Sequence, residues 1–313
     1  MSISKEIERL QQAKKDIGDA IVRKGGSVSG TIDTYAKSVM ALGDVSFRTA
    51  INIVNKSDAK NVDLTMISPR NETDLSRLFY KNDKLVSIDV SNWDTSQVTS
   101  VGSIFCNCSS LTKLDVSNWN TSKFTTIREF VYGCQALTTF DANRWNTSNV
   151  TIMESVFTNC PSLNSINISE WDTSNVTNMW RMFWNCKSLT DLDLSGWNTS
   201  NVTDAKYLFY NCETLVTLDI SGWNMNKIKS MLGVFSLCHK LNEIRCDGLK
   251  LPNIDLKNIR LDNCPLSVDS IVGLLNALPQ SDKGYSFQIG SNNIAKLTDE
   301  QKAIATDKGW TLI

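Results

Sequence analysis

The chain has 313 residues, a formal net charge of −1 and a hydrophobic content of 41%. No apolar run approaches the ~18 residues that a membrane-spanning helix requires, so we expect no membrane insertion. The balanced charge does not supply the basic surface that nucleic-acid binding needs, and the first residues do not have the pattern of a secretory signal peptide.

Residues 1–44 predict a helical module. Apolar residues recur at three- and four-residue steps over three heptads, with a polar break at Lys14, which is typical of a coiled-coil seam or an amphipathic helix. The apolar positions are Ile3, Ile7, Leu10, Ile17 and Ile21. Isoleucine at both seam positions favours three or four strands, so we expect an oligomerisation or attachment module with a trimer favoured. The alternative is a helical hairpin that only caps the rest of the chain.

Residues 45–84 are interpreted as an N-terminal cap followed by a degenerate first repeat. Apolar residues alternate with others from 45 to 54, which predicts an edge strand. The segment 62–65, followed by Leu75, Leu78 and Phe79, matches the later repeats without their tryptophan. Atypical terminal units are expected because the ends of a repeat stack must be covered.

Residues 85–266 contain a 26-residue repeat in which tryptophan, cysteine and phenylalanine return at constant intervals, with Val131 in the second phenylalanine position. The tryptophans are Trp93, Trp119, Trp145, Trp171, Trp197 and Trp223, and the cysteines are Cys108, Cys134, Cys160, Cys186, Cys212 and Cys238. A fixed period of this length is typical of a solenoid, because so short a unit must stack on its neighbours to bury its apolar face.

Each repeat predicts a strand, a corner and a helix. In the repeat that begins at Leu189, apolar and polar residues alternate through 195, which indicates a short half-buried strand. Turn-forming residues follow at 196–201, and apolar residues then recur at helical spacing from Val202 to Cys212. We therefore predict an α/β repeat solenoid: a right-handed stack of about eight rungs, with a parallel sheet on one face and short helices on the other.

Residues 267–313 are predicted to form a C-terminal cap. This segment looks like the closing segment of similar repeat proteins, which implies a helix at 266–278, a strand at 285–290 and a last helix that begins after Thr298. Gln301 stands three residues after Thr298, which is the spacing of a capping box.

The cysteine ladder, which Cys264 continues, is expected to be reduced and buried. Equivalent residues of neighbouring rungs lie ~4.7–4.9 Å apart with parallel Cβ vectors, whereas a disulfide needs Cβ atoms ~3.5–4.5 Å apart that point towards each other. The close pair Cys106 and Cys108 lacks the second pair that a zinc site requires. We therefore expect no metal.

The sequence contains few of the residue patterns that are typical of catalytic sites. The single histidine, His239, cannot form a histidine-based triad or a multi-histidine metal site, and no glycine-rich phosphate loop stands between a strand and a helix. We expect a non-enzymatic protein without a cofactor. A glycan-degrading enzyme is less favoured because no two carboxylates stand out from the repeated set.

Outward-facing strand residues are the candidate binding surface. An acidic row is nearly constant, and a row beside it varies from rung to rung. The candidates are Lys113, Asp115, Thr139, Asp141, Ser165, Asn167, Asp191, Asp193, Thr217 and Asp219. The acidic row is either satisfied by local hydrogen bonds or a strip that faces a cation or ligand. The tryptophan ladder is interpreted as corner packing, with stacking against sugar rings as the alternative.

The repeat resembles the BspA-type leucine-rich repeats of bacterial and phage surface proteins. The string Leu-x-x-Leu-Asp-Leu-Ser-x-Trp-Asn/Asp-Thr-Ser-Asn-Val-Thr is nearly intact at 85–99, 111–125, 163–177 and 189–203. The resemblance covers residues 59–266 and implies a leucine-rich-repeat-like fold used in adhesion or recognition.

A second and shorter resemblance concerns residues 13–25 and 34–36, which look like the opening module of many tailed-phage structural proteins. It implies a virion protein made in the host cytoplasm and placed in the tail, a fibre or another exposed attachment site. Its N-terminal module would contact other virion proteins, and its solenoid would bind a host-surface glycan or protein. The alternative is a bacterial cell-surface adhesin.

Overall fold

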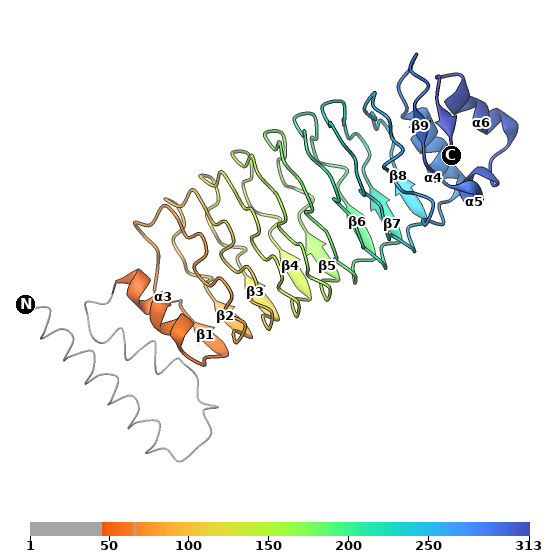
Figure 1. Cartoon of the computed structure of the whole chain (residues 1–313). Helices are drawn as coiled ribbons and strands as arrows, with labels where there is room; N and C mark the ends of the chain where they lie inside the picture. The colour runs from red at the N-terminus through yellow and green to blue at the C-terminus, as the bar shows by residue number, and fades with distance from the viewer. Residues whose placement is uncertain (1–45, 66) are drawn as a thin grey trace, which may run out of the picture.

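A computed structural model describes residues 46–65 and 67–313 as a straight stack of parallel rungs (Figure 1). Each rung contributes one three-residue strand, and neighbouring strands pair with a constant offset of 26 residues, as between Ser87 and Lys113. The strands are β1 (Asn61–Asp63), β2 (Ser87–Asp89), β3 (Lys113–Asp115), β4 (Thr139–Asp141), β5 (Ser165–Asn167), β6 (Asp191–Asp193), β7 (Thr217–Asp219) and β8 (Glu243–Arg245). The parallel solenoid predicted from the repeat is confirmed.

The strand face differs from the single continuous sheet that the repeat suggests. Strand pairing forms three separate ladders, β1–β3, β4–β5 and β6–β8. A second line of parallel bridges runs across both interruptions, from Asp74 through Ser100, Thr126, Ile152 and Asn178 to Asp204. The rungs therefore remain in register where the strand ladder is broken.

The predicted short helices are wrong, because the segments that follow the corners are chains of tight turns. In residues 204–212, the Tyr207 N–H donates to the Leu232 oxygen of the next rung at 2.8 Å, whereas the Leu208 N–H closes a turn on the Ala205 oxygen at 3.3 Å. Alternate residues thus bond between rungs and within their own turn. An α-helix would instead direct its interior N–H groups to carbonyls four residues back.

Spacing explains why turns replace helices. Strands of neighbouring rungs stack ~4.7–4.9 Å apart, while packed helices need 8–10 Å between their axes. Helices on one side would force the stack to curve, and the stack in Figure 1 is straight. In the turn segments from residue 77 to residue 237, two positions per rung have positive φ, such as Arg181 at 58° and Asn185 at 63°, and Gly133 occupies the second of these positions at 71°. A Cβ atom on Gly133 would lie 2.3 Å from Asn107 Oδ1, so a side chain there requires the Asn107 side chain to shift.

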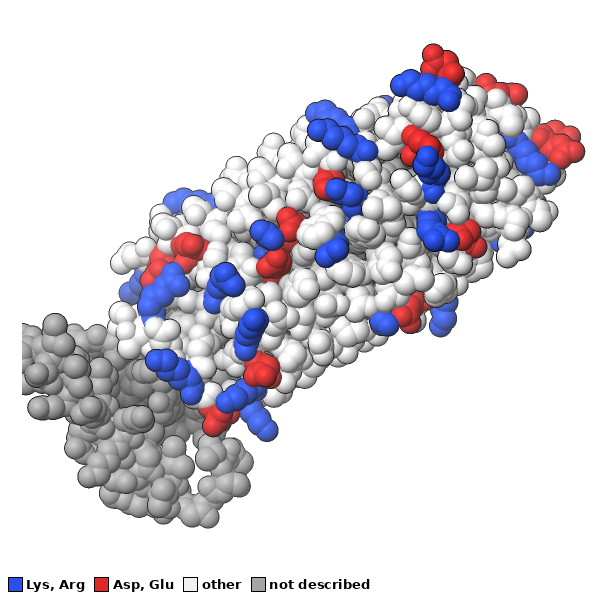
Figure 2. Space-filling view, viewed as in Figure 1, with Lys and Arg blue, Asp and Glu red and all other residues white. Residues whose placement is uncertain are grey.

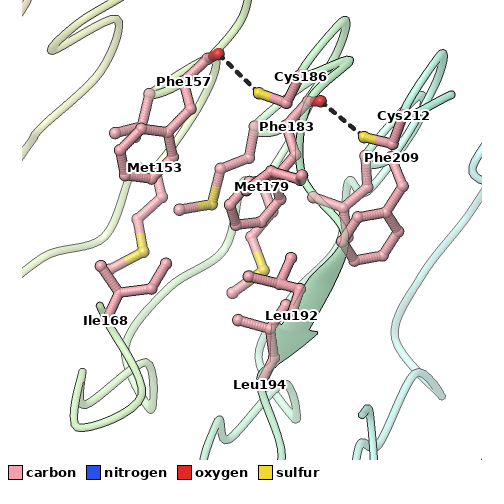
Figure 3. Packing of buried hydrophobic residues seen from close by; sticks show 14 of the residues in the cluster. Met153, Phe157, Ile168, Met179, Phe183, Cys186, Leu192, Leu194, Phe209 and Cys212 are labelled. Carbon is pink, nitrogen blue, oxygen red and sulfur yellow. Dashed lines mark hydrogen bonds between the residues drawn. The ribbon is translucent and has the colours of Figure 1, made fainter. Parts of the chain in front are cut away.

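Repeated polar side chains connect the rungs. Each repeat tryptophan donates its indole N–H to a carbonyl of the preceding rung, as from Trp171 to Ala142 at 2.8 Å. The ladder cysteines donate from Sγ in the same direction, as from Cys186 to the Phe157 oxygen at 3.1 Å (Figure 3). A buried threonine in the five corners from Thr95 to Thr199 donates to the following rung, as from Thr173 to the Asn198 oxygen at 3.1 Å. The tryptophan, cysteine and threonine positions therefore each supply hydrogen bonds between rungs.

The core is one continuous column of stacked apolar side chains. Phe183 is completely buried and stacks between Phe157 and Phe209, with ring centroids 5.6 Å away on each side. Figure 3 shows this stack beside methionine and leucine side chains of the same rungs. Where Val131 replaces a phenylalanine, the adjacent Phe130 turns inward and packs edge-on against Trp145 at 5.2 Å. The column therefore stays filled at this rung.

The N-terminal end is covered by helix α3 (Phe47–Lys56), so the edge strand predicted for 45–54 is wrong. The hydroxyl of Ser46 caps the helix, and Ala50, Ile51 and Val54 are buried against the first rung. These positions fit the period of a helix as well as the alternation of a strand, and the N-cap favours the helix.

The C-terminal end is closed by helices α4 (Val268–Asn276), α5 (Ser291–Ile294) and α6 (Asp299–Thr306), with the parallel strands β9 (Ser286–Phe287) and β10 (Thr311–Leu312). The helix α4 lies within the range predicted for it. The capping box of Thr298 and Gln301 is present at the start of α6 and is confirmed.

Candidate recognition surface

The candidate residues lie on one exposed strip, which we call the strand face: the outward positions of β2 to β8. In each strand the central residue points into the core, as for Leu192, which is 5% exposed, while its two neighbours point outward. Pairing places Asp191 beside Thr217 and Asp193 beside Asp219. The structure therefore brings the sequence-predicted candidates together as two adjacent rows.

The acidic row is held by local hydrogen bonds. Asp193 Oδ1 accepts from the Ser195 backbone N–H at 3.0 Å and from its hydroxyl at 2.7 Å, and Asp115 makes the same pair of bonds with Ser117. The backbone N–H and hydroxyl of Ser195 lower the pKa of Asp193. Of the two interpretations of the acidic row, these bonds agree with the one in which local hydrogen bonds satisfy the carboxylates. They also offset the repulsion between carboxylates that lie one rung apart.

The neighbouring row is free of such bonds at most positions. Side chains of Lys113, Thr139, Ser165, Asp191 and Thr217 make no hydrogen bond or ion pair with other residues in the described ranges. Each is at least partly exposed. Because these groups vary in charge and size on a constant scaffold, this row can present a specific pattern to a partner.

Charged groups of both signs are mixed over the molecular surface. Figure 2 shows lysine and arginine interspersed with aspartate and glutamate on the viewed face. Many are paired, as in the 2.6 Å contact of Lys187 with Glu213. On this face, therefore, no broad basic area of the kind that binds nucleic acid is seen.

Within residues 46–65 and 67–313, no group of three or more His, Cys, Asp or Glu side chains is placed to hold a metal ion. The same part of the chain contains no helix long and apolar enough to cross a membrane. A cavity of about 10 Å³ lies under the C-terminal cap and is lined only by apolar side chains such as Met231, Phe235 and Phe287. Such a cavity offers no polar partner for a substrate.

The tryptophan and cysteine ladders lie inside the molecule. The repeat tryptophans are 1–4% exposed and stack nearly parallel, as for Trp171 and Trp197 at 6.2 Å and 5°. Their rings are therefore not available to sugar partners, and the packing interpretation is confirmed. All nine cysteines are buried. Burial raises the pKa of the Cys160 and Cys238 thiols to about 12.

The predicted attachment residues Ile3, Ile7, Leu10, Ile17 and Ile21 lie outside the described residues. Their role in oligomerisation and the preference for a trimer stay predictions. The sequence interpretation also missed a group of partly exposed aromatic residues around Arg181 on the turn segments. The available signal was the departure of Trp180 and Trp184 from the repeat, since the equivalent positions of the neighbouring rungs hold Glu154, Lys206, Thr158 and Tyr210.

Comparison with solved structures finds leucine-rich-repeat proteins. A leucine-rich cell-surface protein of Faecalibacterium prausnitzii is 15% identical, with a TM-score of 0.30, over 82% of this chain and 84% of that one. A leucine-rich repeat protein of Bacteroides ovatus is 12% identical, with a TM-score of 0.28 and the same coverage. A Leptospira interrogans protein of this type is 12% identical, with a TM-score of 0.21, over 77% and 75%. These scores are low, so the assignment of the fold rests on the strand pairing above.

The in-register strands, stacked turns and buried ladders define a parallel solenoid of the leucine-rich-repeat type. The chain belongs to the family described as "Mycoplasma protein of unknown function, DUF285", which matches it over residues 47–139 and 130–246. No curated protein matches this chain.

Proposed function

We propose that this chain is a non-enzymatic recognition protein of a bacterial cell surface, an adhesin of the leucine-rich-repeat type. The observation that carries the proposal is the contrast on the strand face. The acidic row is occupied by local hydrogen bonds, while Lys113, Thr139 and Asp191 in the adjacent row vary and have no partner within the described residues. A regular scaffold with a variable exposed row is suited to binding a host-surface protein or glycan.

The proposal favours the adhesin over the virion protein. The virion interpretation depends on residues 1–44, which lie outside the described residues, and the three similar structures named above come from bacteria. The BspA-type motifs of 59–266 imply adhesion or recognition, which an adhesin provides without any contribution from residues 1–44. We therefore do not carry the tail or fibre assignment further.

Surface labelling tests the location. Intact producing cells are treated with a membrane-impermeant amine reagent, and labelling of Lys113 is compared with labelling after lysis. A cytoplasmic protein of the same cells is the control. Surface display predicts that Lys113 is labelled on intact cells while the control is not. Labelling of Lys113 only after lysis would exclude the proposed location.

A further inference from the structure

An aromatic–arginine cluster, which we define as Trp180, Arg181, Trp184, Tyr207 and Tyr210, lies on the turn segments of two adjacent rungs. The guanidinium carbon of Arg181 is 4.1 Å from the Trp180 ring centroid and 4.0 Å from the Trp184 ring centroid. Tyr207 lies 5.5 Å from the same carbon, and Tyr210 packs edge-on against Trp184 at 5.9 Å. All five side chains are partly exposed.

The solenoid does not need this cluster for its own packing. Equivalent positions of the preceding rung hold Glu154, Ser155 and Thr158, and that rung is stacked in the same register. Partly exposed tryptophan, tyrosine and arginine are the residues that most often dominate binding energy at interfaces. The cluster therefore has the composition of a binding site.

The charge of Arg181 is unpaired within the described part of the chain. Its Nε is buried without a hydrogen-bond partner, and its two Nη groups make no hydrogen bond or ion pair there. The acids of the adjacent rungs are already engaged, since Glu154 pairs with Arg128 at 3.0 Å and Asp204 with Lys206 at 3.1 Å. An unsatisfied guanidinium held between two indoles is ready to accept an external anion through its Nη edge.

Polar amides follow two of the aromatic residues in the chain. Asn185, which follows Trp184, donates to Asn159 at 2.7 Å, and Asn211, which follows Tyr210, donates to Asn185 at 2.7 Å, so the amides form a short ladder across three rungs. The oxygen of Asn211 has no hydrogen-bond partner among the described residues. The cluster thus combines aromatic faces, hydrogen-bonding amides and one unpaired cation.

We propose that the aromatic–arginine cluster binds an acidic saccharide, with the sugar carboxylate on Arg181 and the sugar ring against the exposed indoles. A pyranose ring presents weakly positive C–H groups to the negative face of an aromatic ring. Its hydroxyl groups suit amide partners, and its carboxylate accepts two parallel N–H bonds from guanidinium. An acidic peptide offers the carboxylate but lacks the apolar faces bordered by hydroxyl groups. This site lies on the turn segments, so it goes beyond the strand-face function proposed above.

The test titrates the full chain with a glucuronate-ended oligosaccharide and its glucose-ended counterpart, with an acidic peptide as a third probe. Calorimetry gives the affinity, and tryptophan fluorescence reports contact with the cluster. Wild type should prefer the glucuronate-ended probe. Arg181→Gln should bind that probe ~10- to 100-fold more weakly, as expected when charge-assisted hydrogen bonds are lost. Trp184→Leu should weaken both sugars.

Arg77→Gln is the matched control, because Arg77 occupies the equivalent position and stacks on a single ring, Tyr80, at 4.3 Å. This variant should bind as wild type does. Near-UV circular dichroism confirms that each variant is folded. Equal binding of the two sugars by wild type, tighter binding of the peptide, or unchanged affinity in folded Arg181→Gln would each overturn the proposal. A strand-face variant, Lys113→Ser with Asp191→Ser, should retain acidic-saccharide binding, which separates this site from the strand-face function.

Discussion

Phe183 shows what one side chain contributes to the solenoid. It is completely buried between two parallel phenylalanine rings, and its removal leaves a gap that the stacked rungs on both sides cannot close independently. We expect Phe183→Ala to cost ~3–5 kcal/mol, the usual range for truncation of a buried phenylalanine. Because each rung contacts only its neighbours, the loss should appear first in residues 163–215.

Hydrogen exchange of the full chain measures this effect segment by segment. Val216→Ala is the control, because Val216 is 40% exposed and surface changes usually stay within ~0.5 kcal/mol. Unchanged exchange of residues 163–215 in Phe183→Ala would mean that Phe183 is not part of the core.

The ladder thiols make stability depend on alkaline pH. Desolvation raises the pKa of Cys160 and Cys238 from 9.0 to about 12, so these thiols stay neutral in the folded chain at a pH where they ionise in the unfolded one. The stabilising effect is complete below pH 9 and is lost as the pH rises from 9 towards 12. Within that window, each such thiol should lower the free energy of unfolding by ~1.4 kcal/mol per pH unit.

Urea unfolding between pH 8 and pH 11 checks this prediction, because the midpoint should fall as pH rises. Tyrosine and lysine also titrate there, so the comparison is with Cys160→Ala and Cys238→Ala combined, which should show a shallower slope. Identical slopes in the two proteins would show that the ladder thiols do not carry the effect.

The sequence predicted the strands of the repeat correctly but predicted helices where the structure has turn segments. The strands were predictable because Leu192 and its equivalents alternate with polar residues. The turns were not, because Val202, Ala205 and Leu208 recur at spacings that serve both a helix and a chain of four-residue turns. One repeat position did carry a signal for turns, because it holds asparagine or glycine in five successive rungs, as at Gly133 and Asn159. Both residue types adopt the left-handed backbone more readily than others and are unfavourable inside helices.

Leu237 provides a direct test of turn against helix. Its φ is 65°, a conformation that glycine adopts freely and alanine does not. In a turn, Leu237→Gly should be more stable than Leu237→Ala by ~1–2 kcal/mol, whereas in a helix Ala should be more stable by ~1 kcal/mol. Both variants lose all contacts that the leucine makes beyond Cβ, so the difference between them reports mainly the backbone conformation. Urea denaturation of the pair measures it, and greater stability of the alanine variant would contradict the turn.

On the scale of the whole molecule, the repeat predicted the location of the candidate surface but only part of its chemistry. The two outward rows follow from strand alternation, so Asp191 and Asp193 could be placed without a structure. The local bonds that occupy the acidic row depend on the turn at Ser195, and the unpaired charge of Arg181 depends on three-dimensional neighbours. A comparison of each repeat with the residues most common at each position would have identified Trp180 and Trp184 as departures from the repeat.

The whole stack presents a surface of mixed charge (Figure 2), and its strand face is proposed to recognise a partner. The matched variants are Lys113→Ser with Asp191→Ser on the strand face and Lys240→Ser with Glu170→Ser elsewhere. Both pairs remove one exposed cation and one exposed anion. All are made in an Arg181→Gln background, so that the aromatic–arginine cluster does not contribute.

The decisive measurement is binding of these full-length proteins to a panel of host-surface proteins and glycans. Saturable binding to a member of the panel should weaken ~10-fold or more in the strand-face variant, as expected when anchoring contacts are removed, and should not change in the control. Equal binding by the two variants, or no saturable binding to any member of the panel, would contradict recognition through the strand face.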